Sequence, residues 1–149
     1  MSTRAAILAG IVTRLQAIDG TTDEFETTAG AHVVLGDVLA LGPDDPDVVI
    51  GVLPQDDVVS YQGEQLSIQW PIEIQAVVKV DLVDGWQVVE AVLADIKRAI
   101  ELPDRTLGGL VRRQIERGTT LTLEREPGSS TMGVGIVYVA PYTEVWGHP

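Results

Sequence analysis

The most regular alternation of hydrophobic and polar residues lies in the middle of the chain, between Leu66 and Val80. A period of two over such a run is typical of a β-strand with one buried face. Because the run exceeds the usual strand length of ~5–6 residues, we expect a bulge or bend near Pro71. The predicted buried positions are Leu66, Ile68, Trp70, Ile72, Ile74, Ala76, Val78 and Val80.

The first residues show apolar spacings of three and four, which predict an amphipathic helix. Ser2 or Thr3 is the expected N-cap, and Gly20 the expected left-handed C-cap. A polar loop over Thr21–Gly30 follows. The predicted buried stripe consists of Ile7, Leu8, Ile11, Leu15 and Ile18.

A second helix is predicted from Asp84, which would form a capping box with Gln87, to Pro103, which stops it. A further turn or two of helix is expected across Leu107–Glu116, weakened by Gly108 and Gly109. The predicted buried stripe of the second helix consists of Trp86, Val89, Leu93, Ile96 and Ile100.

Short β-branched runs bounded by Gly and Pro predict the remaining strands. Three lie before the long strand, at His32–Leu41, Val48–Leu53 and Val58–Tyr61, with acidic turns between them at 42–47 and 54–57. Near the C-terminus, Thr119–Glu126 and Thr131–Ala140 flank Pro127-Gly128-Ser129-Ser130 and predict a hairpin. A four-residue loop there would pair Leu121 with Ile136 and Leu123 with Val134.

The order of these elements predicts an α+β fold, a mostly antiparallel sheet with the helices packed on one face. The 149 residues fit a single domain over 1–149. The chain contains no cysteine, which excludes disulfides, zinc fingers and thiol catalysis. The apolar run Ala5–Thr13 is too short to span a bilayer, so we expect neither a membrane segment nor a signal peptide.

The net charge of −12 argues against binding to duplex DNA or to anionic membranes. The chain has two histidines and no recognisable catalytic or phosphate-binding motif, so we expect no metal, no cofactor and no enzymatic activity. Acids could form a catalytic pair or a calcium site, but those at Asp44, Asp45, Asp47, Asp56 and Asp57 occupy proline-rich turns. Such acids are expected to be solvated, and their spacing does not match an EF-hand loop.

Charge is unevenly distributed along the chain. No basic residue lies between Arg14 and Lys79, whereas six lie between Lys97 and Arg117. One interpretation is a set of solvated helix faces. The other is a molecule with one acidic and one basic surface, whose copies associate head to tail into a ring.

Several segments together resemble the tail terminator (tail completion) proteins of long, non-contractile-tailed bacteriophages. These are the run Val88–Ile100, the sequence Leu107-Gly108-Gly109-Leu110, the arginine-rich turn after it and the closing Val137–Tyr142. The motif-like part spans 86–146, and the order of elements fits along the whole chain.

The resemblance implies a ring, a hexamer, that caps the head-proximal end of the tail tube, terminates its polymerisation and provides the surface that joins the head. It implies as partners further copies of the chain, the tail tube protein and a head–tail connector or neck protein. DNA would pass through the ring without specific binding. The location would be the virion, after assembly in the host cytoplasm.

For such a ring we expect the turn acids Asp44, Asp45, Asp47, Asp56 and Asp57 to face the lumen. The residues expected at the interface are Arg112, Arg113, Arg117, Tyr142 and Trp146, with the three arginines at the contact between subunits or with the tail tube. Three other hypotheses remain open from the sequence. They are a neck or connector protein of similar fold, a small enzyme or ligand-binding domain that uses a carboxylate pair, and an acidic mimic of nucleic acid.

Overall fold

The computed structural model describes residues 1–36, 41–42, 44–79, 84–122 and 131–149. Within these residues, two α-helices, a short 3-10 helix and a six-stranded sheet make up the fold, which confirms the predicted α+β class. The elements in chain order are α1 (Thr3–Gln16), the 3-10 helix η1 (Ala29–Ala31), β1 (Val33–Leu35), β2 (Val48–Pro54), β3 (Val58–Gln62), β4 (Gln65–Lys79), α2 (Gly85–Glu101), β5 (Glu116–Thr122) and β6 (Thr131–Val145).

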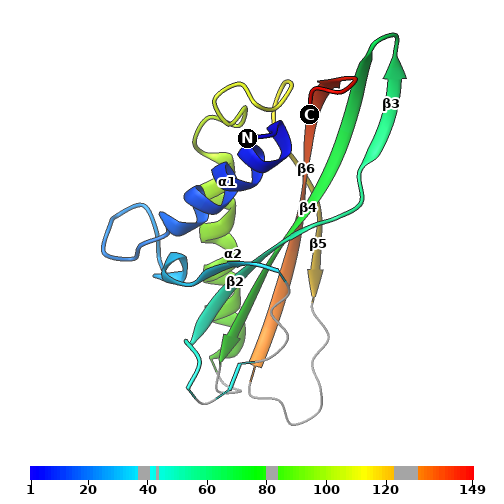
Figure 1. Cartoon of the computed structure of the whole chain (residues 1–149). Helices are drawn as coiled ribbons and strands as arrows, with labels where there is room; N and C mark the ends of the chain where they lie inside the picture. The colour runs from blue at the N-terminus through cyan, green and yellow to red at the C-terminus, as the bar shows by residue number, and fades with distance from the viewer. Residues whose placement is uncertain (37–40, 43, 80–83, 123–130) are drawn as a thin grey trace.

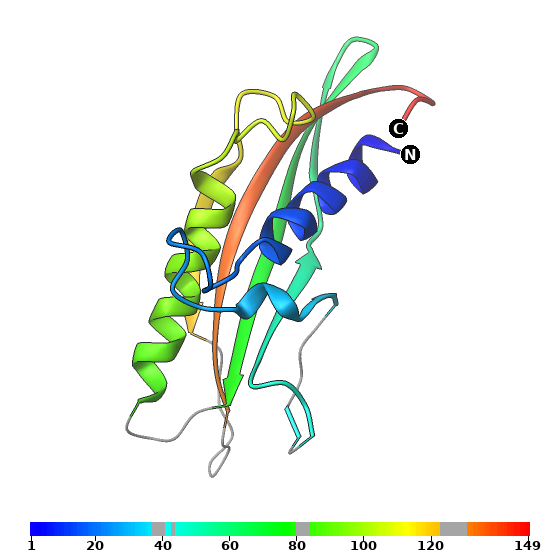
Figure 2. The ribbon, with the colours of Figure 1, turned by 90° about the vertical axis from the view of Figure 1, so that its left-hand side faces the viewer.

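The strands run in the order β1-β2-β4-β6-β5, and β3 pairs with β4 beyond the end of β2. Every pair is antiparallel except β1 with β2. Both helices cover the same face of the sheet, and the opposite face carries none of the described helices (Figures 1 and 2). The core lies between the helices and the covered face.

Strand β4 confirms the predicted alternation, since Ile68, Trp70, Ile72, Ile74, Ala76 and Val78 are buried. The expected bulge is absent from its pairing with β6, which runs unbroken from Gln65–Val145 to Lys79–Thr131. The irregularity lies instead on the other side of β4, where β2 ends and β3 begins. Pro54 pairs with Ile72 and Val58 with Gln69, so residues 55–57 lie opposite only 70–71. The ladder is interrupted beside Pro71 because proline has no N–H to donate to a neighbouring strand.

Helix α1 begins as predicted, because the Ser2 hydroxyl accepts a hydrogen bond from the backbone N–H of Ala5 at 3.2 Å. Its apolar stripe is buried at Ile7, Ile11 and Leu15. The predicted C-cap at Gly20 is wrong: the helix ends at Gln16 with Ala17 as its right-handed C-cap. The following loop packs tightly below this end, since a Cβ at Gly30 would lie 2.5 Å from the Leu15 carbonyl oxygen.

Helix α2 ends before Pro103 as predicted. Two details are wrong. The Asp84 side chain makes no capping hydrogen bond, and Trp86 is 56% exposed. Trp86 is exposed because the buried face of the helix also includes Val92, Asp95 and Ala99. The buried face is rotated from the predicted stripe toward these three positions, which leaves Trp86 at its rim.

The predicted helical turns across Leu107–Glu116 are also wrong. Leu107, Gly108 and Gly109 have φ values of 51°, 70° and 89°, a run of left-handed residues that no right-handed helix accommodates. Turns and bends occupy the segment instead.

The C-terminal strands β5 and β6 are antiparallel as predicted, but the register is wrong by one residue. Leu121 pairs with Gly135, and Thr120 with Ile136. Leu121 therefore lies on the face away from the helices and is 38% exposed. Parts of three other predictions fall outside the described residues: the end of the His32–Leu41 strand, Val80, and the hairpin loop with Leu123.

Candidate functional site

The acids between Gly42 and Val48 form an exposed turn at the lower end of the sheet in Figure 1. The Asp45 carboxylate accepts a hydrogen bond from the backbone N–H of Gly42 at 2.5 Å. The Lys79 backbone N–H donates to the Asp47 carbonyl at 2.8 Å, which joins the turn to the end of β4. Asp44, Asp45 and Asp47 thus lie together in solvent, as the sequence predicts for turn acids.

Asp56 and Asp57 lie where β2 passes into β3, and they differ in their contacts. Asp57 forms an ion pair with Arg4 of α1 at 2.8 Å, and the Arg4 guanidinium stacks on the Trp70 ring at 4.1 Å from its centroid. Asp56 is exposed and has no hydrogen bond or ion pair to any residue that the structure describes. Asp57 therefore joins α1 to the sheet, and Asp56 is left for solvent or another molecule.

The arginine-rich segment after α2 is organised by Asp104. Its carboxylate accepts hydrogen bonds from the backbone N–H and hydroxyl of Thr106 at 2.9 and 2.6 Å, and from the N–H of Gly108 at 3.0 Å. These bonds, those from Thr106 above all, lower the pKa of Asp104 to about 2. The segment is consequently an ordered loop despite its glycines.

Arg112 and Arg113 belong to this loop, which lies between α2 and β5. The Arg112 backbone N–H donates to the Pro141 carbonyl of β6 at 2.7 Å, and Arg113 has a left-handed φ of 69°. Both side chains are exposed, and neither forms a hydrogen bond or ion pair within the described part of the chain. They line a cavity of about 260 Å³ whose other walls are Gln62, Ser67, Gln69, Glu116, Pro141 and Tyr142.

Arg117 is engaged inside the chain. Its guanidinium holds the Glu101 carboxylate through two hydrogen bonds of 2.5 Å each, and the Tyr138 hydroxyl donates to the same carboxylate at 2.9 Å. The bond from Arg117 is the main reason why the pKa of Glu101 is lowered, while burial raises that of Tyr138. This network joins β5 and β6 to the end of α2. The geometry thus separates Arg117 from the free pair Arg112 and Arg113.

The two aromatic residues predicted at contacts occupy different environments. Tyr142 is buried in the core, where its ring meets Trp70 edge-on with centroids 6.2 Å apart. Trp146 is 58% exposed and stacks on Tyr61 of β3, with centroids 5.8 Å apart. Burial therefore assigns Tyr142 to packing within this chain, and Trp146 is the aromatic residue of the two that another molecule can reach.

The sequence analysis did not identify Asp95, a fully buried carboxylate on α2. It accepts hydrogen bonds from the backbone N–H groups of Glu26 and Thr27, at 3.1 and 2.7 Å, and from Arg98 at 2.7 Å. The available signal was its position, since Asp95 follows Val92 by three residues and precedes Ala99 by four, on the buried side of the helix. This residue fixes the loop after α1 to α2.

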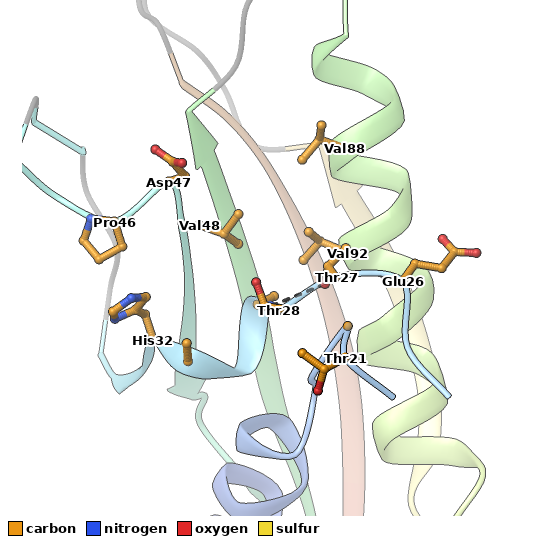
Figure 3. Close-up of a pocket in the computed structure, with 13 residues that line it drawn as sticks. Thr21, Glu26, Thr27, Thr28, His32, Pro46, Asp47, Val48, Val88 and Val92 are labelled. Carbon is orange, nitrogen blue, oxygen red and sulfur yellow. Dashed lines mark hydrogen bonds between the residues drawn. The ribbon is translucent and has the colours of Figure 1, made fainter. Parts of the chain in front are cut away.

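A cavity of about 610 Å³ opens between η1, the turn before β2 and helix α2. Two carboxylates line it, Glu26 and Asp47, together with His32. Figure 3 shows Glu26 and Asp47 on opposite sides of the space, with neither carboxylate directed at the other. The Glu26 carboxylate instead forms an ion pair of 3.4 Å with the Arg98 guanidinium. The geometry does not bring an acid–base pair together here.

The described residues offer no candidate metal centre and no membrane-spanning helix. They contain no group of three or more His, Cys, Asp or Glu side chains arranged to hold a metal ion. None of the described helices combines the length and apolar character needed to cross a bilayer. The charged surfaces at the two sides of the sheet therefore remain the main candidates for a functional site.

Comparison by sequence gives no match to a family model or to a curated protein. Comparison by structure gives a match over nearly the whole chain. The chain is similar to a protein in the virion of a native gene transfer agent (GTA) particle, with a TM-score of 0.63 and 16% sequence identity. The alignment covers 95% of this chain and 98% of that one. At this identity the likeness establishes a shared fold, complete from end to end.

Proposed function

We propose that this protein is a structural component of a phage or phage-like particle and has no enzymatic role. The observation that carries the proposal is the end-to-end likeness in fold to a chain of a GTA virion. A fold hosts many functions, so the site must support the same conclusion. Here the exposed charged residues offer surfaces for other molecules, and the carboxylates of the cavity between η1 and α2 are not paired.

Within that class, we propose a tail terminator: a ring, six copies in the resembling family, that caps the head-proximal end of the tail tube. The resemblance of residues 86–146 supports this assignment, as does the separation of acidic and basic surfaces, which suits head-to-tail association. The exposed acids at 44–47 would face the lumen, where negative charge keeps passing DNA from binding.

Tube assembly tests this proposal. Tail tube protein of the same particle is polymerised with and without this chain, and tube lengths are measured by electron microscopy. A terminator is expected to give shorter tubes as its concentration rises, with labelled protein at one end of each tube. Unchanged tube lengths together with no label at tube ends would contradict the terminator role.

The fold likeness supports a neck or head–tail connector protein equally well, because it relates this chain to a chain of a whole particle rather than to a named part of one. Binding to isolated portal assemblies but not to tube ends would favour the connector. The same labelled protein serves both experiments, so one preparation separates the two roles.

A further inference from the structure

We propose that the cavity beside Arg112 and Arg113 receives the carboxylate of Asp56 from a second copy of this chain. This inference rests on the proposed function in one respect, namely that copies form a ring. It adds the contact that joins them: the arginine-lined cavity of one copy, which extends from β3 to the start of β5, meets the segment between β2 and β3 of the next. Such a heterologous contact has a direction and closes into a ring when the rotation allows.

The cavity has the composition of a carboxylate site. Two guanidinium groups and one carboxylate, that of Glu116, line it, so its net charge matches a single added carboxylate. Gln62, Ser67 and Gln69 supply further polar groups. Neither arginine is neutralised by an ion pair within the described residues, and arginine can bind a carboxylate through two parallel hydrogen bonds.

The arginines are also held in place before any partner binds. Asp104 fixes the start of their loop, and the Ile115 backbone N–H donates to the Arg105 carbonyl at 2.8 Å, which closes the loop. The bond from the Arg112 N–H to Pro141 fixes the other side. Left-handed backbone at a non-glycine residue such as Arg113 is costly and is concentrated at functional sites. A fixed loop lowers the entropy cost of association.

The segment between β2 and β3 supplies the acid. Residues 33–64, which include β1, β2 and β3, contain no lysine or arginine. Strands β4 and β6 separate β2 from β5, which carries Glu116 of the cavity, by roughly 14 Å at a strand spacing of ~4.8 Å. Among the acids between β2 and β3, Asp57 is already paired with Arg4. Asp56 is the exposed carboxylate that remains.

Asp56 also lies at the same height on the sheet as the cavity. The Gln55 N–H donates to the Pro71 carbonyl at 2.9 Å, and Arg112 bonds to Pro141, which pairs with Gln69. The two sites thus differ by about two residues along β4, or ~7 Å, whereas the 44–47 turn lies beside Lys79, ~30 Å away. Rotation about the axis of a ring leaves the position of each residue along that axis unchanged. In a ring whose axis follows the strands, Asp56 of one copy and the cavity of the next therefore differ by only ~7 Å along the axis, which suits a contact between copies rather than a position in the lumen.

Charge reversal with rescue tests the pairing, read out by native mass spectrometry over a range of concentrations. Arg112→Glu with Arg113→Glu is expected to weaken association at least about tenfold. Adding Asp56→Arg to that variant is expected to restore it. The matched control adds Asp44→Arg and Asp45→Arg instead, which should not restore it. Unfolding curves should be unchanged for the first two variants, because their sites are exposed and unpaired within the described residues, and the control should be only slightly destabilised by loss of the Asp45 hydrogen bond.

Cysteine cross-linking gives a second readout, and the cysteine-free chain makes it clean. Asp56→Cys with Arg113→Cys is expected to form a ladder of disulfide-linked copies under oxidation, and Asp45→Cys with Arg113→Cys is not. A protein that stays monomeric at every concentration overturns the proposal. Association that survives the arginine reversal also overturns it, and so does rescue by the 44–45 reversal.

The two proposals fail in different ways. If the arginine-reversed variant still shortens tail tubes and still forms an oligomer, the contact is wrong and the terminator function stands. If the variant with Asp56→Cys and Arg113→Cys forms the disulfide ladder but the wild type leaves tube lengths unchanged, the contact stands and the terminator function is wrong.

Discussion

Charged residues in this protein are used in two different ways, at α2 and at the sides of the sheet. On α2, Asp95 and Glu101 each accept hydrogen bonds from several groups of the same chain. At the sides of the sheet, Asp56, Arg112 and Arg113 are exposed and have no partner among the described residues. The first group stabilises the fold, because a buried charge must be paired. The second group leaves stability unaffected and is available for recognition.

This difference predicts that mutations will separate stability from association. Removal of a charge that is paired within the chain should lower the free energy of unfolding and have no specific effect on the association of copies. Removal of an exposed, unpaired charge should weaken association and leave the free energy of unfolding unchanged. The experiments below compare matched residues on the two sides of this distinction.

The largest expected effect is that of Asp95→Ala. The substitution leaves two backbone N–H groups and Arg98 without their acceptor, and hydrogen bonds to a charged group contribute about 1.5–3 kcal/mol each. We expect a loss of about 3 kcal/mol, measured by urea unfolding. Glu90→Ala, on the exposed side of the same helix, should change the value by less than about 0.5 kcal/mol. A similar loss in both variants would contradict the assignment.

The two buried tyrosines of β6 provide the next comparison. Tyr138→Phe removes the hydrogen bond to Glu101 and is expected to cost about 1.5 kcal/mol. Tyr142→Phe removes a buried hydroxyl that has no hydrogen-bond partner among the described residues, so it should cost nothing or slightly stabilise the protein. Urea unfolding of both variants measures the difference. An equal loss for both would show that the Tyr142 hydroxyl is satisfied in solution.

Local periodicity correctly predicted the elements that bury one face and expose the other. The alternation in β4 and the stripe of α1 were correct because one face of each packs on the core. The errors fall where the chain makes choices that no local pattern encodes. The register of β5 against β6 depends on a bulge between Arg117 and Thr120, and its one-residue shift exposes Leu121.

The candidate site shows the same limit. The sequence identified the acidic turns and the arginine-rich segment, because charge counts require no structure. It could not distinguish Arg117 from Arg113, since the partner of Arg117 is sixteen residues away on α2. Nor could it distinguish Tyr142 from Trp146, whose burial depends on the pairing of β6 with β4. Tertiary contacts decide which charges remain free.

That distinction between arginines predicts a smaller pair of effects. Arg117→Ala breaks a two-bond ion pair to a partly buried carboxylate and is expected to cost about 1 kcal/mol of unfolding free energy. Arg113→Ala should cost less than about 0.5 kcal/mol. In native mass spectrometry the order should reverse, with association weakened more by Arg113→Ala. Equal effects of both variants on association would place Arg117 at the contact as well.

The smallest expected effect concerns pH and tests whether the Glu101 network acts within the folded chain. The hydrogen bond from Arg117 holds the pKa of Glu101 below its ordinary value of 4.5 in the folded state. A carboxyl whose pKa is lowered by folding stabilises the fold fully above its unfolded pKa, and that contribution disappears as pH falls through the folded value. The unfolding free energy of the wild type should therefore decline below about pH 4.5, and that of Glu101→Gln should decline less.

Asp104, whose pKa falls from 3.8 to about 2, adds a second decline of the unfolding free energy at lower pH, and Asp104→Asn should remove it. Arg113→Ala should retain the wild-type pH profile, because its guanidinium contacts neither carboxylate in the described structure. Parallel profiles for Glu101→Gln and the wild type would show that this network does not distinguish the folded from the unfolded chain.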